Sequence, residues 1–496
     1  MKKISSIFLL ITSLFILSCN NKSSSTTPIG IVGEIIVNPY GVTPLSAIYT
    51  TESVNTVPIT VTVKGLYGEP DIIHTYPAGY GTEFEIHGMF PESQNTIIVN
   101  DGGRIISKNV NIANLSVRGT AIQKKYDIEI NNLSQEKYPN NPNLYFVGLN
   151  TDSYFSFAIS ENGYTRYISE VEIISKTVVD NNIIKLYTAG AGIYDLMGNR
   201  KFSITKSHHD MIKKGNNYIY LSKSQWGVED RLIEANSSGN IIRDLYFGDL
   251  IRNIVNKNAD KEEIDILNKI VLDDKNIYNP SGQQKAVDWF HANSLVYDSD
   301  TDILYVSGRN LAVLAIDYSK WELIWWMADD NFYNAGSIYG KYLKDLKSLQ
   351  DYKIKGAGNT DGPKNQHALF LHKNGNLGMF DNQGDEISNP NGSRYVEYKI
   401  IGTHGNYTAE KSYEYRDPSL YSQVTSDVDF TGENYQNILI TYGYPTGTIL
   451  EIEKNSQKLL FKLELPYFLY RADKMPLYYD EGRIYSEDCN LKNNSY

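Results

Sequence analysis

The chain has 496 residues, of which 41% are hydrophobic and 21% are charged, and its formal net charge at pH 7 is −11. This length exceeds what one hydrophobic core usually supports, so we expect two domains or one large repeat architecture. The composition excludes a mainly disordered chain. The acidic balance excludes a nucleic-acid partner, because nucleic-acid phosphates require a basic surface.

Residues 1–19 carry the features of an export signal. Two lysines precede the apolar run Ile7–Leu17, which is too short to span a bilayer. Ser18 stands directly before Cys19, as in a lipoprotein box, where the cysteine is lipidated and becomes the mature N-terminus; an ordinary signal cut elsewhere is the alternative. Residues 20–30 are typical of a flexible tether. We expect an exported protein that is lipid-anchored to the cell envelope through Cys19, as a periplasmic or outer-membrane lipoprotein.

Residues 31–126 form short runs of alternating polarity separated by Gly, Pro, Asn and Asp, such as "VPITVTVKGLYG" and "GTEFEIHGMF". Several short strands at this spacing predict an N-terminal β-sandwich. His74 and His87 lie in this region without another reactive group nearby, so we interpret both as structural.

Residues 127–496 show a different pattern, in which a strand, a turn with Asp, Asn or Gly and another strand recur, as in "GIYDLMGNRKFSI" and "GTILEIEKNSQKLLFKLEL". The unit recurs at the spacing of propeller blades, and about six such units fit the length. We therefore predict an all-β protein, with the β-sandwich followed by a six-bladed β-propeller that carries the functional site.

One insertion near residues 250–275 has a helical pattern. Asp260 and Glu263 resemble a capping box. The expected buried stripe has helical spacing and comprises Ile264, Leu267 and Val271. Because this helix interrupts the blades, we expect it to decorate the surface.

Three short stretches combine histidine with polar neighbours, and a fourth ends in arginine. They are Ser207–Asp210, Asp288–Ser294, Lys364–Phe370 and the strand that ends at Arg309. Histidine titrates near neutrality, so it can act as a base, an acid or a nucleophile. Inner strands and loops of a propeller converge on its central channel, where residues distant in sequence can meet. A single histidine is nevertheless more often structural than functional.

A zinc site is one interpretation of these histidines. However, the chain has no HxH or HExxH spacing, and an arginine repels cations. Arginine instead favours an oxyanion, which it holds by a forked pair of hydrogen bonds. We therefore predict no metal and no cofactor, and a site that binds or transfers an anionic group.

Six segments in chain order carry a family resemblance. They are Asn38–Tyr49, His208–Leu221, Asp288–Arg309, Asn365–Asn382, Ser393–Ile400 and Tyr470–Tyr478. Together they resemble the bacterial arylsulfate sulfotransferases that need no nucleotide sulfate donor. The resemblance implies an aryl sulfate donor, a phenolic acceptor and a homodimer. Some members of the family rely on a nearby cysteine pair, which this sequence lacks.

The resemblance also implies roles for individual residues. His367 would be the nucleophile that takes up the sulfuryl group and passes it on through a ping-pong cycle with a sulfohistidine intermediate. His291 and Arg309 would hold the sulfate oxygens. His209 is favoured as the fourth catalytic residue because it precedes an aspartate directly, and His208 is kept as the alternative and as a substrate-binding candidate.

Four further residues complete these expectations. Asn293 is a substrate-binding candidate, and with Asp288 it would either orient the neighbouring histidine or cap a turn. His372 and His404 are interpreted as structural or exposed. Two alternatives to the sulfotransferase stay open. One is a non-catalytic propeller lipoprotein that binds an anionic ligand or a protein partner, and the other is a metal-dependent hydrolase.

Overall fold

The computed structural model describes residues 32–131, 137–149, 155–171, 174–180, 182–188, 192–204, 207–223, 229–258, 260–267, 288–331, 346–384, 391–403, 405–483 and 485. The predicted export signal, the lipidation site Cys19 and the tether lie outside these ranges, as do Val271 and His404. Within the described ranges no helix is long and apolar enough to cross a membrane.

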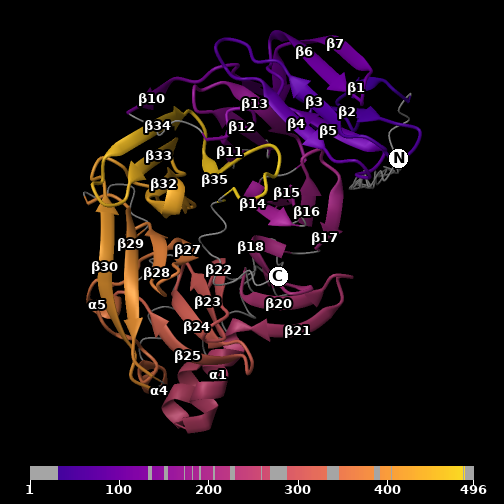
Figure 1. Ribbon diagram of the computed structural model, residues 1–496. Helices are drawn as coiled ribbons and strands as arrows, with labels where there is room; N and C mark the ends of the chain where they lie inside the picture. The colour runs from indigo at the N-terminus through magenta and orange to yellow at the C-terminus, as the bar shows by residue number, and fades with distance from the viewer. Residues whose placement is uncertain are drawn as a thin grey trace, which may run out of the picture.

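The N-terminal domain consists of two antiparallel sheets (Figure 1). The smaller sheet contains β1 (Ile35–Val37), β2 (Ser46–Thr50) and β5 (Glu83–His87). The larger one contains β4 (Ile72–Tyr76), β3 (Ile59–Val63), β6 (Ser93–Asn100) and β7 (Ile105–Ile112). In β3 the apolar residues alternate with threonines and every second residue is buried. This period of two gives each sheet one apolar face, as the sequence predicts for a sandwich. The hairpin of β8 (Leu115–Val117) and β9 (Thr120–Ile122) follows.

Six further antiparallel sheets form the propeller within the described residues. The second blade contains β14 (Ile174–Asp180), β15 (Ile183–Thr188), β16 (Gly192–Asp195) and β17 (Arg200–Ser203). The third contains β18 (Ser207–Lys214), β19 (Asn217–Ser222), β20 (Arg231–Asn236) and β21 (Ile241–Tyr246). The fourth contains β22 (Ala292–Asp298), β23 (Ile303–Gly308), β24 (Ala312–Asp317) and β25 (Glu322–Met327). In each sheet the strands follow one another in chain order, so each blade is a meander.

Two blades gain an extra strand. The fifth blade contains β27 (His367–Leu371), β28 (Leu377–Asp381), β29 (Arg394–Ile401) and β30 (Thr408–Arg416), with β26 (Lys355–Gly356) added in parallel at its outer edge. The sixth contains β31 (Asp427–Thr431), β32 (Asn437–Tyr442), β33 (Gly447–Glu453) and β34 (Leu459–Leu465), with β10 (Ile128–Ile130) at its edge. These additions cover strand edges that would otherwise be open.

The first blade joins the two ends of the propeller. Its outer strands are β11 (Leu144–Leu149), β12 (Phe155–Ser160) and β13 (Thr165–Ser169), and its inner strand β35 (Leu469–Met475) comes from the C-terminal end. Inner strands of neighbouring blades contact one another where β35 meets β14 and β31, where β22 meets β18 and β27, and where β27 meets β31. The blades therefore surround a common centre (Figure 1).

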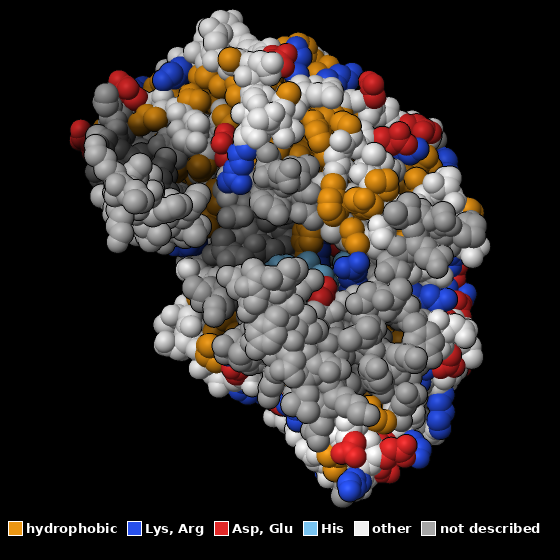
Figure 2. Space-filling view, turned by 180° about the vertical axis from the view of Figure 1, so that it is seen from behind, with side chains coloured by type: hydrophobic (Ala, Val, Ile, Leu, Met, Phe, Trp, Pro, Cys, Tyr) orange, Lys and Arg blue, Asp and Glu red, His pale blue; other side chains and the backbone are white. Residues whose placement is uncertain are grey.

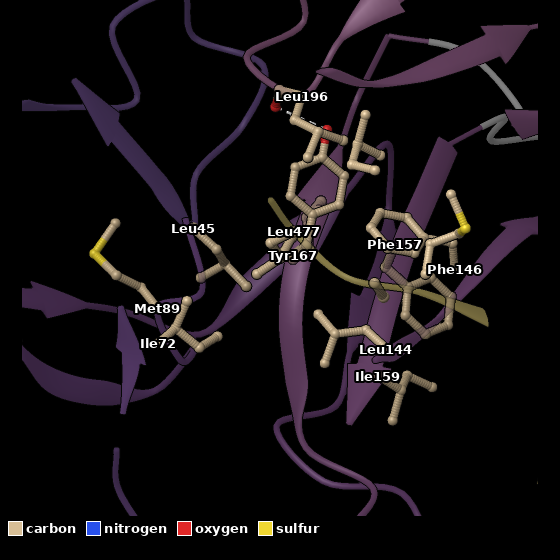
Figure 3. Packing of buried hydrophobic residues seen from close by; sticks show 14 of the residues in the cluster. Leu45, Ile72, Met89, Leu144, Phe146, Phe157, Ile159, Tyr167, Leu196 and Leu477 are labelled. Carbon is tan, nitrogen blue, oxygen red and sulfur yellow. Dashed lines mark hydrogen bonds between the residues drawn. The ribbon is translucent and has the colours of Figure 1, made fainter. Parts of the chain in front are cut away.

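The two domains share one hydrophobic core. Leu45 and Met89 of the N-terminal domain belong to the same buried cluster as Leu144 and Leu477 of the propeller (Figure 3). A buried ion pair also joins them, because Arg166 Nη1 of β13 lies 3.1 Å from a carboxylate oxygen of Glu69. The domains are thus packed as one body and are not joined by a tether alone.

Short helices complete the chain. They are α1 (Phe247–Asn258), α4 (Lys347–Gln350), α5 (Ala357–Thr360) and the 3₁₀ turn η1 (Glu433–Tyr435), and residues 261–267 are also helical. Asp260 caps this last segment, since its Oδ1 accepts the N–H groups of Glu262 at 2.8 Å and Glu263 at 3.3 Å. The Glu263 carboxylate, however, accepts a hydrogen bond from the backbone N–H of Ser348 at 2.8 Å.

The interpretation of the helix after Asp260 as a surface decoration was wrong, because Leu267 is 5% exposed and lies in the same buried cluster as α1. The buried face of α1 comprises Phe247, Leu250, Ile251, Ile254 and Val255, which pack into one cluster with Trp289 and Phe290. The rings of Phe247 and Phe290 lie 4.4 Å apart. Because Phe290 directly precedes His291, the helix supports the segment that carries this histidine.

Candidate active site

The predicted histidines lie on neighbouring inner strands of the propeller. His208 and His209 are in β18, His291 directly precedes β22, and His367 is the first residue of β27. Strand β22 contacts both β18 and β27. Figure 2 shows histidine side chains in a hollow of the surface, beside basic and acidic side chains. Three blades therefore bring the histidines of separate sequence motifs to one place.

Hydrogen bonds hold His367 in one tautomer. Its Nδ1 lies 2.7 Å from Oδ1 of Asn382. The amide nitrogen of Asn382 donates to the carbonyls of Ser422 at 2.7 Å and Thr425 at 3.3 Å, which fixes the orientation of the amide. Its oxygen must then accept a proton from His367 Nδ1. The lone pair of the imidazole is consequently on Nε2, which makes no hydrogen bond to any residue in the described ranges.

His367 is also kept uncharged. The residue is 4% exposed, and burial together with the nearby Arg309 guanidinium holds the pKa of His367 well below its ordinary value. The backbone of Arg309 is fixed on both sides, because its N–H donates to the carbonyl of His291 at 3.0 Å and its carbonyl accepts from the Asn365 amide at 3.3 Å. A neutral imidazole thus lies in the field of a cation, as an attack on an anionic ester requires.

The centre of the histidine cluster is a carboxylate that sequence reasoning missed. Glu229 is 4% exposed, and its oxygens lie 2.8 Å from Nδ1 of His208, 2.9 Å from Nε2 of His209 and 2.9 Å from Nε2 of His291. Burial alone would raise the pKa of Glu229, but the imidazoles outweigh it and hold that pKa below its ordinary value. Glu229 is therefore ionised.

His291 carries the proton of this cluster. Its Nε2 faces Glu229, and its Nδ1 lies 2.9 Å from both carboxylate oxygens of Asp288. Burial opposes a charge on His291, yet these two carboxylates raise its pKa to about 9. With both nitrogens donating, His291 is an imidazolium.

His209 is the neutral member. Burial lowers the pKa of His209 to about 4, although Glu229 opposes this change. Its Nε2–H donates to Glu229, so its Nδ1 accepts the hydroxyl hydrogen of Tyr470. Burial raises the pKa of Tyr470 above its ordinary value, which keeps the phenol protonated. A chain of carboxylate, imidazole and phenol results.

Unusual backbone conformations produce this convergence. His209, Glu229 and His291 have positive φ angles of 54°, 53° and 56°, a conformation that non-glycine residues seldom adopt. Around His209 the pairing register of β18 with β19 also shifts. Glu229 lies 20 residues beyond His209 and shortly before β20, so no local spacing relates the two. Its position beside Asp230 was the only signal in the sequence of an acidic group there.

Asn293 lies beside the cluster, but its amide nitrogen is bound to the backbone of the neighbouring blade. Its Nδ2 donates to the carbonyl of Gln366 at 2.8 Å, which joins β22 to the start of β27. Its backbone carbonyl accepts from Nη2 of Arg471 at 3.0 Å. Asn293 thus aligns two histidine-bearing strands, and its predicted contact with substrate stays a prediction.

Arg471 of β35 lies beside a group of buried carboxylates, one of them on the neighbouring inner strand β31. Its Nε lies 3.9 Å from Asp427, and a second cation, Lys176, lies 2.8 Å from Asp210. Burial raises the pKa of Asp427 to about 7 despite the nearby arginine. Two clusters of the described residues have metal-ligating atoms within 4.8 Å of one another, and they are His208 with His209 and Glu229, and Asp427 with Asp429 and Asp473.

The other three histidines of the described residues lie apart from the cluster. His372 contacts the Tyr395 hydroxyl at 2.8 Å, His87 contacts Ser46 at 2.8 Å, and the His74 ring stacks on Tyr478. Each of them has a partner of its own within its blade or at the domain interface.

Fold and site together define a two-domain β-propeller enzyme. The profile described as "Arylsulfotransferase (ASST)" matches residues 129–475, and the "Arylsulfotransferase Ig-like domain" matches residues 34–113. The chain belongs to the arylsulfotransferase family, and it is therefore an aryl-sulfate sulfotransferase.

Individual relatives agree with this membership. The arylsulfate sulfotransferase AssT of Escherichia coli O6:H1 is 22% identical over 88% of this chain and 91% of its own length. AssT of Lelliottia amnigena is 26% identical over 48% of this chain and 45% of its own. Among solved structures, the β-propeller domain of Cps50 (Swd1) from Myceliophteria thermophila has a TM-score of 0.38 at 11% identity and covers 69% of this chain and 87% of that domain.

Proposed function

We propose that this enzyme moves a sulfuryl group from a phenolic sulfate ester to a phenolic acceptor in a ping-pong cycle, with the group carried on Nε2 of His367. The observation that supports this most strongly is the fixed tautomer of His367, with Nδ1–H donated to Asn382 and Nε2 left as a lone pair. A neutral imidazole can attack without first losing a proton, and covalent capture divides one difficult step into two.

In the first half-reaction Nε2 of His367 forms a bond to sulfur as the bond from sulfur to the aryl oxygen breaks. The phenolate leaves with the electron pair of that bond. Its pKa is near that of tyrosine, about 10, so it departs without strong protonation. By analogy with phosphoryl transfer, the transition state is loose and in line, with charge spread over the equatorial oxygens.

Arg309 and His291 supply the positive charge for this transition state. The charge of the Arg309 guanidinium lowers the pKa of His367, and His291 is an imidazolium in the nearby histidine cluster. A guanidinium matches the geometry of sulfate oxygens by its forked donors. One well-placed donor of this kind is worth about 3–4 kcal/mol.

In the second half-reaction the acceptor phenol attacks sulfur, and the bond from sulfur to Nε2 breaks. The acceptor must lose its proton. The hydrogen-bonded chain from Tyr470 through His209 to Glu229 offers a path, because His209 Nδ1 already accepts from a phenolic hydroxyl. We assign His209 as the base, reached directly or through Tyr470.

We further propose that the enzyme is exported and anchored to the envelope by lipid on Cys19. The support is the short apolar run Ile7–Leu17, which is followed directly by Ser18 and Cys19. Labelling cells with a radioactive fatty acid tests it, since the wild-type chain should incorporate label and Cys19→Ser should not. A labelled Cys19→Ser chain would contradict the anchor.

The transfer is tested with a chromogenic aryl sulfate, with and without added phenol. We expect chromophore release that depends on the phenol and a sulfurylated peptide containing His367 after mixing with donor alone. His367→Ala should abolish both, whereas the matched variant His372→Gln should retain them. Release without any acceptor would indicate a hydrolase, and no release from a panel of aryl sulfates would favour a binding propeller.

A further inference from the structure

Adjacent histidines in strand β18 turn to the same side. In a regular strand successive side chains point to opposite faces of the sheet. Here the register shift between Ser207 and Met211 and the positive φ of His209 interrupt the alternation. As a result His208 and His209 both reach the carboxylate of Glu229.

The atoms gathered there form a set of metal-ligating donors. Nδ1 of His208, Nε2 of His209 and a carboxylate oxygen of Glu229 lie within 4.8 Å of one another. Nε2 of His291 lies 2.9 Å from the same carboxylate and becomes a fourth ligand once it has lost its proton. Two or three imidazoles with one carboxylate suit a four-coordinate, borderline-soft divalent ion such as Zn²⁺.

The proposed sulfuryl transfer assigns no role to His208. Glu229 already orients His209 and His291, and the chain of proton acceptors is complete without His208. Its Nδ1 lies 2.8 Å from Glu229 yet has no partner in hydrogen-bonding geometry among the described residues. The His208 side chain is 42% exposed, although its Nδ1 atom is itself buried beside Glu229.

The negative charge of Glu229 also disfavours the binding of a sulfate group close to it. Glu229 is buried beside the residues proposed to stabilise an anion, where like charges repel strongly. The same carboxylate attracts a cation. Because Glu229 lies 20 residues from His209, the donor set contains none of the local spacings on which the sequence argument against a metal was based.

We propose that His208, His209 and Glu229 bind a divalent transition-metal ion and that the bound ion blocks sulfuryl transfer. The binding depends only on the geometry of the three side chains. The block rests on the proposed function. An ion on Nε2 of His209 displaces the proton there to Nδ1, so Nδ1 can no longer accept the proton of the acceptor phenol.

The binding is tested by titrating the purified full-length chain, freed of metal by a chelator, with Co²⁺ while recording visible absorption. We expect one equivalent to give the intense bands of four-coordinate cobalt, and Zn²⁺ to displace it. His208→Gln, at an exposed side chain, should weaken binding roughly 10–100-fold or more. The matched variant His372→Gln should bind as the wild type does.

Other spectra would overturn the site. Only the weak bands of six-coordinate cobalt would exclude a four-coordinate histidine site. Equal affinity of the wild type and His208→Gln would place the ion elsewhere, such as at the aspartates of β31 and β35. Inhibition by Zn²⁺ and recovery on adding chelator are measured separately by aryl sulfate turnover. A chain that binds Co²⁺ but does not turn over aryl sulfates would contradict the proposed function and leave the metal site standing. A chain that turns over aryl sulfates but does not bind Co²⁺ would contradict the metal site and leave the proposed function standing.

Discussion

Asn382 and His367 form the contact that defines the nucleophile. The amide oxygen of Asn382 accepts the Nδ1 proton of His367 at 2.7 Å, and the amide nitrogen is held by the Ser422 and Thr425 carbonyls. An asparagine that could rotate freely would accept either tautomer of the imidazole. Fixed as it is, it leaves Nε2 as the nitrogen that can attack.

Replacing Asn382 should therefore change the tautomer or the pKa of His367 while the histidine itself is kept. Asn382→Leu removes the constraint on the tautomer, and we expect turnover to fall roughly 10²-fold. In Asn382→Asp the new carboxylate favours the imidazolium, so the pKa of His367 should rise and the pH–rate profile should shift to higher pH. Both are measured as aryl sulfate turnover against pH. Asn376→Leu is the control, and equal profiles for all three variants would contradict the assignment.

Arg309 should not be replaceable by lysine. Its planar guanidinium can hold two sulfate oxygens at once, whereas lysine offers a point charge on a flexible stem. We expect Arg309→Lys and Arg309→Met to lose about 3–4 kcal/mol of transition-state stabilisation, roughly 10²–10³-fold in turnover. Single-turnover release of phenolate measures the first half-reaction. A lysine variant with nearly full activity would show that charge alone suffices; Arg231→Lys, at a surface ion pair, is the control.

Tyr470→Phe should separate the two half-reactions. The variant removes the hydroxyl that donates to His209 but keeps the ring. If protons from the acceptor pass through Tyr470, turnover with phenol falls roughly 10²-fold. The burst of phenolate released from donor alone should stay at the wild-type rate. A slower burst with unchanged acceptor dependence would assign Tyr470 to the donor step.

Helix α1 should matter to the site as well as to stability. Phe247 is fully buried against Phe290, so Phe247→Ala should cost about 3–5 kcal/mol of unfolding free energy. Turnover at a temperature where the variant is folded should also fall, because Phe290 precedes His291. Urea unfolding and turnover are the two measurements. The exposed Asn256→Ala on the same helix should change neither, and full activity in Phe247→Ala would show that α1 acts on stability alone.

Asp427 should make the propeller less stable as pH rises. The charged groups around it are Arg471, Asp473, Asp210 and Asp429. Burial raises the pKa of Asp427 to about 7, above its unfolded value of about 3.9. Such a group favours the folded state fully below pH 4, and this contribution is lost as pH rises through 7.

Asp427→Asn removes this titration. We expect it to melt at a higher temperature than the wild type at pH 8, with the difference shrinking towards pH 4. Thermal melts at the two pH values measure the change. Asp300→Asn in an exposed turn is the control, and a larger gain for Asp427→Asn at pH 4 than at pH 8 would reverse the predicted sign.

The fold could be predicted from the sequence because side chains of a strand alternate between the two faces of a sheet, and this alternation is visible in the sequence. The alternation in β3 and the turns rich in Asp, Asn and Gly gave the sandwich and the six blades, and these predictions are confirmed. The histidines of the site could be named because each stands in a recognisable segment. Their meeting follows from the radial arrangement of β18, β22 and β27.

Glu229, Asn382 and α1 could not be predicted in their roles, for a physical reason common to all three. Each acts through a partner that is distant in the chain, and no local period relates the two. Glu229 contacts His209 where the pairing of β18 shifts, Asn382 depends on carbonyls of the segment between β30 and β31, and α1 packs against Phe290. Sequence spacing describes neighbours along the chain, whereas these contacts are between neighbours across the channel.

The closing strand β35 has a consequence for when the enzyme becomes active. It carries Tyr470 and Arg471, and Arg471 ties the carbonyl of Asn293 on the opposite side of the ring. Among the described strands β35 is the last to be synthesised, so a chain that stops before it has the site histidines but lacks Tyr470 and Arg471. Such a chain cannot capture aryl sulfates while it is still being made. Catalytic competence thus requires that synthesis has passed β35.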